Sequence, residues 1–439
     1  MNRIAFGTDG IRGQVGQFPI TLEGFNLLGQ ACRLWLTNQG LPLTLAVGWD
    51  TRESGSALAQ AFADGLGSEA HIVFLGITPT PGVSLYVEHE KMALGVAITA
   101  SHNPYTDNGF KLFGPNGAKL SRASEQAIEQ LAEDLSFQNI RCSTIEKIAG
   151  SEYVLTYWKQ RLAPNTFAGR KIVLDTANGA TVFTTLPLLR YLGLEVVSLG
   201  NKPNGHNINE HCGSEYVEEL RQAVIDSKAW LGFAQDGDGD RLRVIDEQGV
   251  LLDGDCVLGL LAIDASARHQ LKNNRLVCTE QSNSGLSDSL HSLGIKTLRC
   301  GIGDREVFYT LESVGGNLGG ESSGHIILKD EAPTGDGLRV LLRLLTLAQQ
   351  QPLHQRAQQI HLCPKAEASL LVRQKLPLEQ LNHLNKLRER LISAKRIHIR
   401  YSGTENKLRF LVESNTQQEC TEQLQALIQA AEEDFKINA

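Results

Sequence analysis

The sequence predicts an α/β fold, in which three similar α/β domains with mixed, mostly parallel sheets and a smaller α+β C-terminal domain surround a central cleft. Three observations support this prediction. A length of 439 residues, at roughly 100 to 200 residues per domain, suggests three or four domains. A unit of strand, helix and strand recurs three times along the chain. This alternation stops after about residue 365.

In each repeat unit an apolar strand ends in a polar loop, a helix follows, and a second strand ends in Gly. Short apolar runs that alternate with helices are typical of parallel sheets covered on both faces. In the first unit the expected strand, helix and strand are 43–50, 54–66 and 71–76. In the second they are a strand over 171–175, a helix that ends near 191, and a strand over 194–200. In the third they are 275–280, 284–293 and 295–301.

A further strand follows each unit and opens into a polar loop. These strands begin at Leu94, Leu231 and Leu318. Ligands bind outside the carboxyl ends of strands in such sheets, so we expect the three loops to face one cleft. The loops are Ser101-His102-Asn103-Pro104, Asp236-Gly237-Asp238-Gly239-Asp240-Arg241 and Glu321-Ser322-Ser323-Gly324-His325.

The sequence after about residue 365 predicts a small α+β domain that acts as a lid. We expect a strand, a helix over 376–394, strands over 397–401 and 408–413, and a helix over 417–435. The predicted domains are 1–152 with the Ser101 loop, 153–252 with the aspartate loop, 253–365 with the Glu321 loop, and 366–439 as the lid.

Composition and charge exclude several classes of protein. With 41% hydrophobic and 21% charged residues, and no apolar run of roughly 20 residues, the sequence predicts a globular protein that does not enter a membrane. A net charge of −7 argues against a nucleic-acid partner, because phosphate-backbone binding needs clustered positive charge. The N-terminus lacks the apolar segment of a signal peptide, and the eight cysteines lack C-x-x-C spacing, so reduced thiols and a cytoplasmic location are expected.

Three carboxylates at alternate positions, Asp236, Asp238 and Asp240, predict a metal site. The glycines between them let the backbone curl so that the carboxylates converge, and oxygen ligands suit a hard cation such as Mg²⁺. A calcium loop of the EF-hand type is disfavoured, because Arg241 and an apolar strand follow where that motif has Gly and a distal Glu. A solvated turn is the alternative that the sequence leaves open.

Ser101 is the candidate nucleophile. By itself its loop could be an ordinary turn, since Ser, Asn and Pro are common turn residues. The loop is equivalent in the repeat to the aspartate loop, and Lys111 follows ten residues later. A hydroxyl, a metal and a nearby ammonium are what phosphoryl transfer needs, so this combination favours the functional interpretation.

The segment from Gly320 to Gly324 matches the G-x-S-x-G nucleophile elbow of hydrolases, but that elbow lies between a strand and a helix. Here an apolar strand-like run follows His325, so the elbow is rejected on context. Glu321, Ser323 and His325 fit better as hydrogen-bonding groups for a polyhydroxylated ligand.

Two segments are candidate phosphate contacts. Arg400 to Glu405, with Arg409 beyond it, combines turn N–H groups, hydroxyls and guanidinium, although a surface hairpin would look similar. The glycine-rich segment 6–13 ends near Arg12 but adjoins no strand and helix unit, so it predicts neither a P-loop nor a dinucleotide site. Arg12 is a candidate phosphate contact on these grounds.

Six motifs in order resemble the α-D-phosphohexomutase superfamily over essentially the whole chain. They are FGTDGIRG (6–13), TASHNP (99–104), PNGHNIN (203–209), DGDGDR (236–241), GESSGH (320–325) and RYSGTE (400–405). The resemblance implies four domains and a phosphoserine at Ser101, which coordinates Mg²⁺ together with the three aspartates. It also implies a hexose 1,6-bisphosphate that serves as intermediate and activator.

The resemblance assigns roles by motif position. Lys111, His102 and Arg241 would serve proton transfer and charge stabilisation, and Glu321, Ser323 and His325 would contact the sugar. Further substrate contacts would come from Arg12, Arg305, Arg400, Ser402, Gly403, Thr404 and Arg409. This chain departs from the pattern at Asn406, which replaces a usual proline, and at Lys407, which adds a charge.

The implied activity is the interconversion of glucosamine 6-phosphate and glucosamine 1-phosphate by a monomer or homodimer, which would supply UDP-N-acetylglucosamine and cell-wall synthesis. The main alternative is a paralogue with a preference for mannose or glucose phosphates. A phosphatase would release inorganic phosphate instead. A catalytically silent sugar-phosphate sensor would be expected to lack Ser101 or the aspartates, and all are present.

Overall fold

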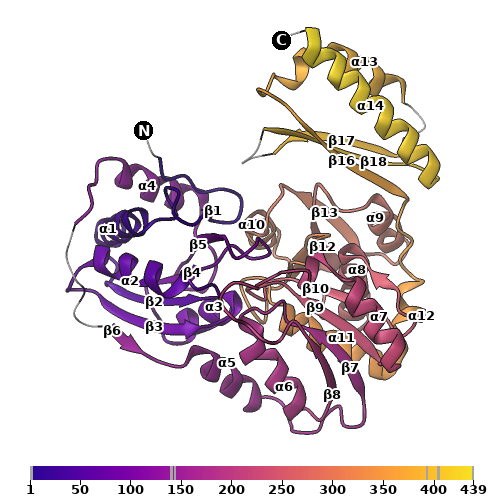
Figure 1. Cartoon of the computed structure of the whole chain (residues 1–439). Helices are drawn as coiled ribbons and strands as arrows, with labels where there is room; N and C mark the ends of the chain where they lie inside the picture. Colours follow the sequence, from indigo (N-terminus) through magenta and orange to yellow (C-terminus); the bar gives the residue numbers. More distant parts are fainter. Residues whose placement is uncertain (1–2, 139–141, 143–144, 392–393, 403–405, 438–439) are drawn as a thin grey trace.

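The computed structural model describes residues 3–138, 142, 145–391, 394–402 and 406–437. The chain forms four domains in sequence order (Figure 1). Residues from all four domains line a central cleft of about 700 Å³. This architecture confirms the fold class that the sequence predicts.

The first domain is built on a six-stranded sheet. Its strands are Ile11–Gln14 (β1), Thr44–Trp49 (β2), His71–Ile77 (β3), Leu94–Ile98 (β4), Asp107–Phe113 (β5) and Ile145–Lys147 (β6), in the order β1-β5-β4-β2-β3-β6. The sequence did not predict β1, which pairs antiparallel with β5 and lies within the glycine-rich N-terminal motif. It also did not predict the short edge strand β6, which pairs with β3.

The second and third domains repeat the central part of this sheet. The second has Lys171–Asp175 (β7), Glu195–Leu199 (β8), Leu231–Gln235 (β9), Leu242–Ile245 (β10) and Leu251–Leu252 (β11), and the third has Arg275–Thr279 (β12), Lys296–Cys300 (β13), Leu318–Gly320 (β14) and Ile326–Leu328 (β15).

The same strand order recurs as β3-β2-β4-β5, β8-β7-β9-β10 and β13-β12-β14-β15. In each set the first three strands are parallel and the last is antiparallel. The three polar loops connect the third and fourth strands of each set. They therefore occupy equivalent places, as the repeat predicts.

Helices cover the sheets. In the first domain they are Leu22–Asn38 (α1), Gly55–Leu66 (α2), Thr80–His89 (α3), Arg122–Glu133 (α4) and Gly150–Lys159 (α5). The second domain has Thr185–Tyr191 (α6) and Glu218–Ser227 (α7). The third has Gly254–Ala267 (α8), Ser284–His291 (α9), Asp304–Val314 (α10), Gly337–Gln350 (α11) and Leu353–Ala357 (α12). Side-chain caps fix several starts: the N–H of Gly24 donates to Thr21 Oγ1 before α1, and Asp336 accepts from two N–H groups of α11.

One apolar core runs from the second domain into the third and also includes Leu85 of α3 and Trp158 of α5. Phe233 on β9, Leu258 on α8 and Leu345 on α11 are fully buried members of it. Helix α11 packs against both β10 and β15, which belong to different domains. The two domains therefore share a core and are expected to unfold together.

The fourth domain has an antiparallel sheet of Lys365–Leu371 (β16), Arg396–Tyr401 (β17) and Lys407–Glu413 (β18) in the order β16-β18-β17, with helices Asn382–Arg390 (α13) and Gln417–Ile437 (α14). Side chains alternate along a strand, so Ile397 and Ile399 pack in the apolar core of this domain while Arg400 lines the cleft. The two helices lie on the side of the sheet that faces away from the other domains (Figure 1).

The helix expected over 376–394 is shorter than predicted, because α13 begins only at Asn382. A 3₁₀ turn over Leu378–Gln380 precedes it. Pro377 keeps Leu376 out of the helix, since a proline disfavours helical backbone in the residue before it. The non-helical backbone of Leu381, with φ −83° and ψ 78°, then separates the 3₁₀ turn from α13.

Among the described residues, no helix is long and apolar enough to cross a membrane.

Candidate active site

Ser101 is fully buried at the end of β4 and has a φ of 54°, in the left-handed region that L-residues rarely adopt. Its N–H donates to Thr99 Oγ1 at 2.9 Å. Its hydroxyl donates to Asp236 Oδ2 at 2.5 Å, across the boundary between the first two domains. Strained backbone of this kind often occurs at functional sites, and here it coincides with the contact between Ser101 and Asp236.

The aspartate loop turns back at Gly239, whose φ of 76° favours glycine. Asp236, Asp238 and Asp240 are each at most 1% exposed. Thr80, the first residue of α3, donates its hydroxyl to Asp238 Oδ2 at 2.6 Å and its N–H to the Asp238 carbonyl at 2.9 Å. The first domain thus orients a carboxylate of the second.

The three carboxylates fit a metal ion. One oxygen from each lies within 4.8 Å of the others, as ligands of a shared cation must. Oδ1 of Asp238 is buried and accepts no hydrogen bond from the described residues, and Oδ1 of Asp240 lies 3.5 Å from His325 Nδ1. Burial, followed by repulsion from Asp240 and Asp238, raises the pKa of Asp236 well above its usual value. A hard divalent cation would satisfy these oxygens and relieve the repulsion.

Lys111 extends from β5 into the carboxylates and is 1% exposed. Its Nζ lies 2.8 Å from Asp238 Oδ2, 2.8 Å from Asp240 Oδ2 and 3.1 Å from Asp9 Oδ2. Although burial opposes the charged form, the aspartates raise the pKa of Lys111 well above its usual value. The ammonium is therefore permanently charged near neutral pH.

Six charged side chains form a closed ring of alternating sign that joins three domains. In order around the ring they are Asp9, Lys119, Asp304, His325, Asp240 and Lys111. Although burial opposes its charged form, Asp240 and Asp304 raise the pKa of His325 to about 10. Of these residues, Asp9, Lys119 and Asp304 were missed at the sequence level, although Asp9 lies within the FGTDGIRG motif.

The other residues predicted near Ser101 also lie there. His102 Nδ1 is 3.4 Å from Ser101 Oγ, and burial, with repulsion from Arg241 and Arg12, lowers the pKa of His102 to about 3. The imidazole is therefore neutral at pH 7. The N–H of Arg241 donates to Asp236 Oδ1 at 3.2 Å, and Arg12 pairs with Asp9 at the rim.

The cleft brings most of the predicted substrate contacts together. Its lining includes Arg12, Glu321, Ser323, His325, Arg400, Ser402 and Arg409. The Oγ of Ser323 is buried and has no hydrogen-bond partner among the described residues. Gly403 and Thr404 lie outside the described residues.

Arg305 is the exception among the predicted contacts. Its Nη1 lies 2.7 Å from Glu125 Oε2, its Nη2 donates to Glu125 Oε1 at 2.8 Å, and the side chain is 6% exposed. Glu125 is on α4, so the pair joins the third domain to the first. Arg305 is not among the described residues that line the cleft, and the geometry favours an interdomain role.

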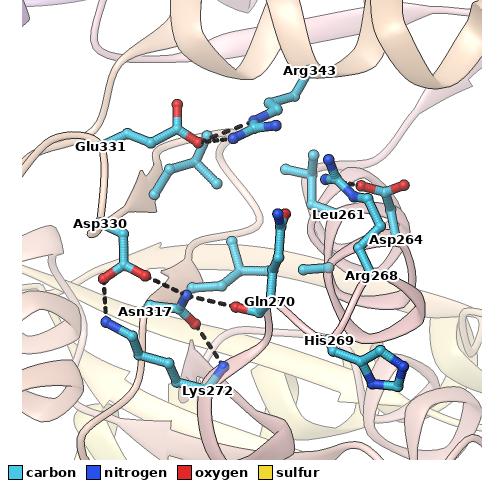
Figure 2. A pocket seen from close by; sticks show the side chains of 13 residues that line it. Leu261, Asp264, Arg268, His269, Gln270, Lys272, Asn317, Asp330, Glu331 and Arg343 are labelled. Carbon is cyan, nitrogen blue, oxygen red and sulfur yellow. Dashed lines mark hydrogen bonds and ion pairs between the residues drawn. The ribbon is translucent and has the colours of Figure 1, made fainter.

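A second cavity, of about 400 Å³, lies in the third domain beside α8 (Figure 2). Arg268 pairs with Asp264 and Arg343 with Glu331 around it, and Lys272 Nζ lies 2.5 Å from Asp330 Oδ1. These charges compensate one another, and none of the predicted site residues lines this cavity. We therefore assign the site to the central cleft.

Similar proteins support this assignment. The chain is 38% identical over 428 residues to phosphoglucosamine mutase of Nitratidesulfovibrio vulgaris, covering 94% of this chain and 95% of the relative. It is 39% identical over 423 residues to phosphoglucosamine mutase of Myxococcus xanthus, covering 93% and 92%.

Solved structures share the fold. A phosphoglucomutase/phosphomannomutase family protein from Burkholderia thailandensis superposes with a TM-score of 0.81 at 24% identity, covering 98% of this chain and 97% of that one. N-acetylphosphoglucosamine mutase of Aspergillus fumigatus, in complex with GlcNAc-6P and magnesium, superposes with a TM-score of 0.67 at 17% identity, covering 99% and 96%.

Family models match the chain in four consecutive parts. All are described as phosphoglucomutase/phosphomannomutase, with alpha/beta/alpha domains I, II and III at residues 3–139, 151–249 and 253–362 and the C-terminal domain at 366–430. Together with the loop geometry and the two relatives, these matches show that the chain belongs to the phosphoglucomutase/phosphomannomutase family, within the α-D-phosphohexomutase superfamily.

Proposed function

We propose that the protein interconverts glucosamine 6-phosphate and glucosamine 1-phosphate through a phosphoserine at Ser101. The observation that carries the proposal is the buried 2.5 Å contact between Ser101 Oγ and Asp236 Oδ2. It lies directly beside a cleft that is lined by the neighbouring residues His102 and Arg241 and by Arg400 and Arg409 of the lid. In the first step the bond between Ser101 Oγ and phosphorus breaks and a bond between phosphorus and a sugar hydroxyl oxygen forms, while the proton of that hydroxyl passes to Ser101 Oγ. The bisphosphate then reorients, and its other phosphoryl group is transferred back to Ser101.

Ser101 and the three aspartates would hold the Mg²⁺ ion. When bound, it would neutralise charge on the transferred phosphoryl group and help to align the two oxygens between which that group moves. The buried Oδ1 of Asp238, which has no hydrogen-bond partner among the described residues, supports this assignment. The Aspergillus fumigatus relative binds magnesium, which is consistent with Mg²⁺ here.

The side chains around Ser101 would divide the remaining work. Lys111 stays charged, so its ammonium stabilises negative charge near the transferred group rather than releasing a proton. His102 is neutral at pH 7, so its ring can accept a hydrogen bond from Ser101 Oγ or from a sugar hydroxyl. Arg241, which lines the cleft beside Asp236, would contact the phosphoryl oxygens.

The lid would hold the phosphate that does not react. Arg400 and Arg409 are direct cross-strand partners on β17 and β18, and both line the cleft. Burial, with repulsion from Arg409, lowers the pKa of Arg400. A phosphate dianion between the two guanidinium groups would relieve that repulsion. Ser402, and Gly403 and Thr404 by motif position, would complete the phosphate site.

The amino sugar is supported by the relatives and by Glu321. Two similar proteins are named phosphoglucosamine mutase. A carboxylate at Glu321 suits the ammonium group of glucosamine, while Ser323 and His325 would contact hydroxyl groups. Mannose or glucose phosphates are the alternative substrates.

The test compares rates of isomer formation by the purified protein on glucosamine, mannose and glucose phosphates, with Mg²⁺ and a catalytic amount of hexose 1,6-bisphosphate. Glucosamine phosphate is expected to turn over fastest. The Ser101→Ala variant should neither turn over nor gain the mass of a phosphoryl group. Faster turnover of mannose or glucose phosphate would refute the amino-sugar assignment, and phosphate release faster than isomer formation would indicate a phosphatase.

A further inference from the structure

The PNGHNIN motif, residues 203–209, has no role in the chemistry proposed above. These residues belong to the second domain but lie against the first. The N–H of Glu53 donates to the Gly205 carbonyl at 3.1 Å, and His206 Nε2 lies 2.6 Å from Glu53 Oε2. The His206 ring also packs edge-on against Tyr105, with 5.2 Å between ring centroids. We call residues 203–209 the strap.

The strap ends at the serine loop. Asn209 is 7% exposed, and its side-chain amide donates to two carbonyl oxygens, that of Ser101 at 2.8 Å and that of Asn103 at 2.9 Å. Its own N–H donates to the Ala177 carbonyl at 2.9 Å, which anchors the residue in the second domain. One amide group thus fixes the backbone on both sides of His102.

A side chain of the first domain contacts the same two carbonyls. Arg52 is 2% exposed, and its Nη2 donates to the Asn103 carbonyl at 2.6 Å and to the Ser101 carbonyl at 3.3 Å. Asp50 orients Arg52 by accepting from its N–H at 3.0 Å and by pairing with its Nη1. The two carbonyls are therefore held by buried donors from two domains.

The backbone of the aspartate loop also packs against the Ser101 carbonyl, beside the two donors Asn209 and Arg52. A Cβ added at Gly237 would lie 2.8 Å from this oxygen, so the backbone of the loop already packs against it. The same hypothetical Cβ would lie 2.6 Å from Ile208 of the strap. The strap, the serine loop and the aspartate loop meet at one carbonyl group.

We propose that Asn209 is a positioning residue, which holds the Ser101 carbonyl beside Arg52 so that the Ser101 hydroxyl stays directed at Asp236. This inference rests on the proposed function. Ser101 must accept and return a phosphoryl group in every turnover, so its oxygen has to return to one place relative to the aspartates. A misplacement of about 1 Å can cost roughly 10²-fold in rate.

The test uses the full chain with Mg²⁺ and measures the rate at which glucose 1,6-bisphosphate phosphorylates Ser101, followed by intact mass. In that step the Ser101 Oγ–P bond forms, the sugar O–P bond breaks, and the serine proton passes to the sugar oxygen. Asn209→Asp is nearly isosteric and tolerates the left-handed backbone that Asn209 adopts, but it replaces the donor amide by an acceptor. Asn209→Ala removes the donor without adding charge.

Both variants are expected to phosphorylate Ser101 about 10²-fold more slowly than the wild type. The kcat for isomerisation should fall while KM stays unchanged, because the lid that binds the distal phosphate is untouched. Asn207→Asp is the matched control, since among the described residues the Asn207 side chain bonds only to the backbone of Lys202, just before the strap, and of Asn204 within it. Its phosphorylation rate should equal that of the wild type.

Wild-type rates in Asn209→Ala would overturn the positioning role, whatever the Asp variant does. Loss of folded structure in Asn209→Ala would also overturn it, because the contact would then be structural. A wild-type protein that takes up no phosphoryl group would instead contradict the proposed function, and the inference would fall with it. Slow phosphorylation of Ser101 in Asn209→Ala, together with wild-type phosphorylation in Asn207→Asp, supports the inference.

Discussion

Replacing Lys111 by methionine removes an ammonium group that lies among three carboxylates while keeping a side chain of similar length. Its Nζ is 2.8 Å from Asp238, 2.8 Å from Asp240 and 3.1 Å from Asp9. Lys111, Asp238 and Asp240 are all about 1% exposed, so water does not compensate for the loss. Breaking a buried ion pair from one side costs about 3–5 kcal/mol.

We therefore expect Lys111→Met to lower the melting temperature by roughly 10 °C in EDTA, at ~2–4 °C per kcal/mol. Adding Mg²⁺ should stabilise the variant more than the wild type, because the cation supplies the missing positive charge. The kcat should fall by about 10²- to 10³-fold, as when a donor to a developing negative charge is removed. Thermal melting with and without Mg²⁺ and steady-state kinetics measure these effects.

Lys329→Met is the matched control. Lys329 Nζ also pairs with a carboxylate, Glu312 Oε1 at 2.5 Å, but both side chains reach solvent. Surface pairs contribute about 0–1 kcal/mol, so this variant should melt almost like the wild type. If Lys111→Met in EDTA melts no lower than this control, the argument that the ammonium compensates buried carboxylates is wrong.

Three further predictions test other parts of the structure. Thr80→Val removes the hydroxyl that donates to Asp238 Oδ2, so the Mg²⁺ concentration for half-maximal activity should rise about 10- to 100-fold, whereas Thr80→Ser should preserve it. Arg400→Gln removes a charge-assisted contact to the distal phosphate, which contributes about 1.5–3 kcal/mol to substrate binding. The KM should therefore rise roughly 10- to 100-fold with kcat largely retained, and an unchanged KM would mean that the phosphate binds elsewhere. Leu345→Ala leaves a cavity in the shared core and should lower the free energy of unfolding by about 2–5 kcal/mol. Hydrogen exchange should then show the second and third domains opening together. Loss of protection in one domain only would contradict a shared core.

Local patterns made the fold class predictable. Strand ends, turns and short helices depend on residues close together in sequence, so β4, β9 and β14 were placed with the polar loops at their ends. The aspartate loop was the strongest signal, because three carboxylates separated by glycines have few other uses. The helix predicted over 376–394 was too long, because Pro377 excludes only the residue before it and the backbone leaves the helical conformation at Leu381 and again at Leu391.

Lys119 and Asp304 carry no local signal of function. Each looks like a surface charge in the sequence, yet Lys119 is 6% and Asp304 4% exposed, and the two are 2.5 Å apart across a domain boundary. Arg305 shows the opposite outcome. It was expected to contact the substrate, and the packing of two domains places it against Glu125.

The sequence by itself determined the three repeated units, the loops at their strand ends and the chemical groups that those loops carry. Only the tertiary structure decided which of these groups meet, because a buried charge must find its partner wherever the packed domains place one. Ser101 lies against Asp236, Lys111 reaches Asp240, and His325 completes the ring through Asp304. Those contacts arise from how the three sheets pack around one cleft, and that packing depends on apolar surfaces spread over the whole chain.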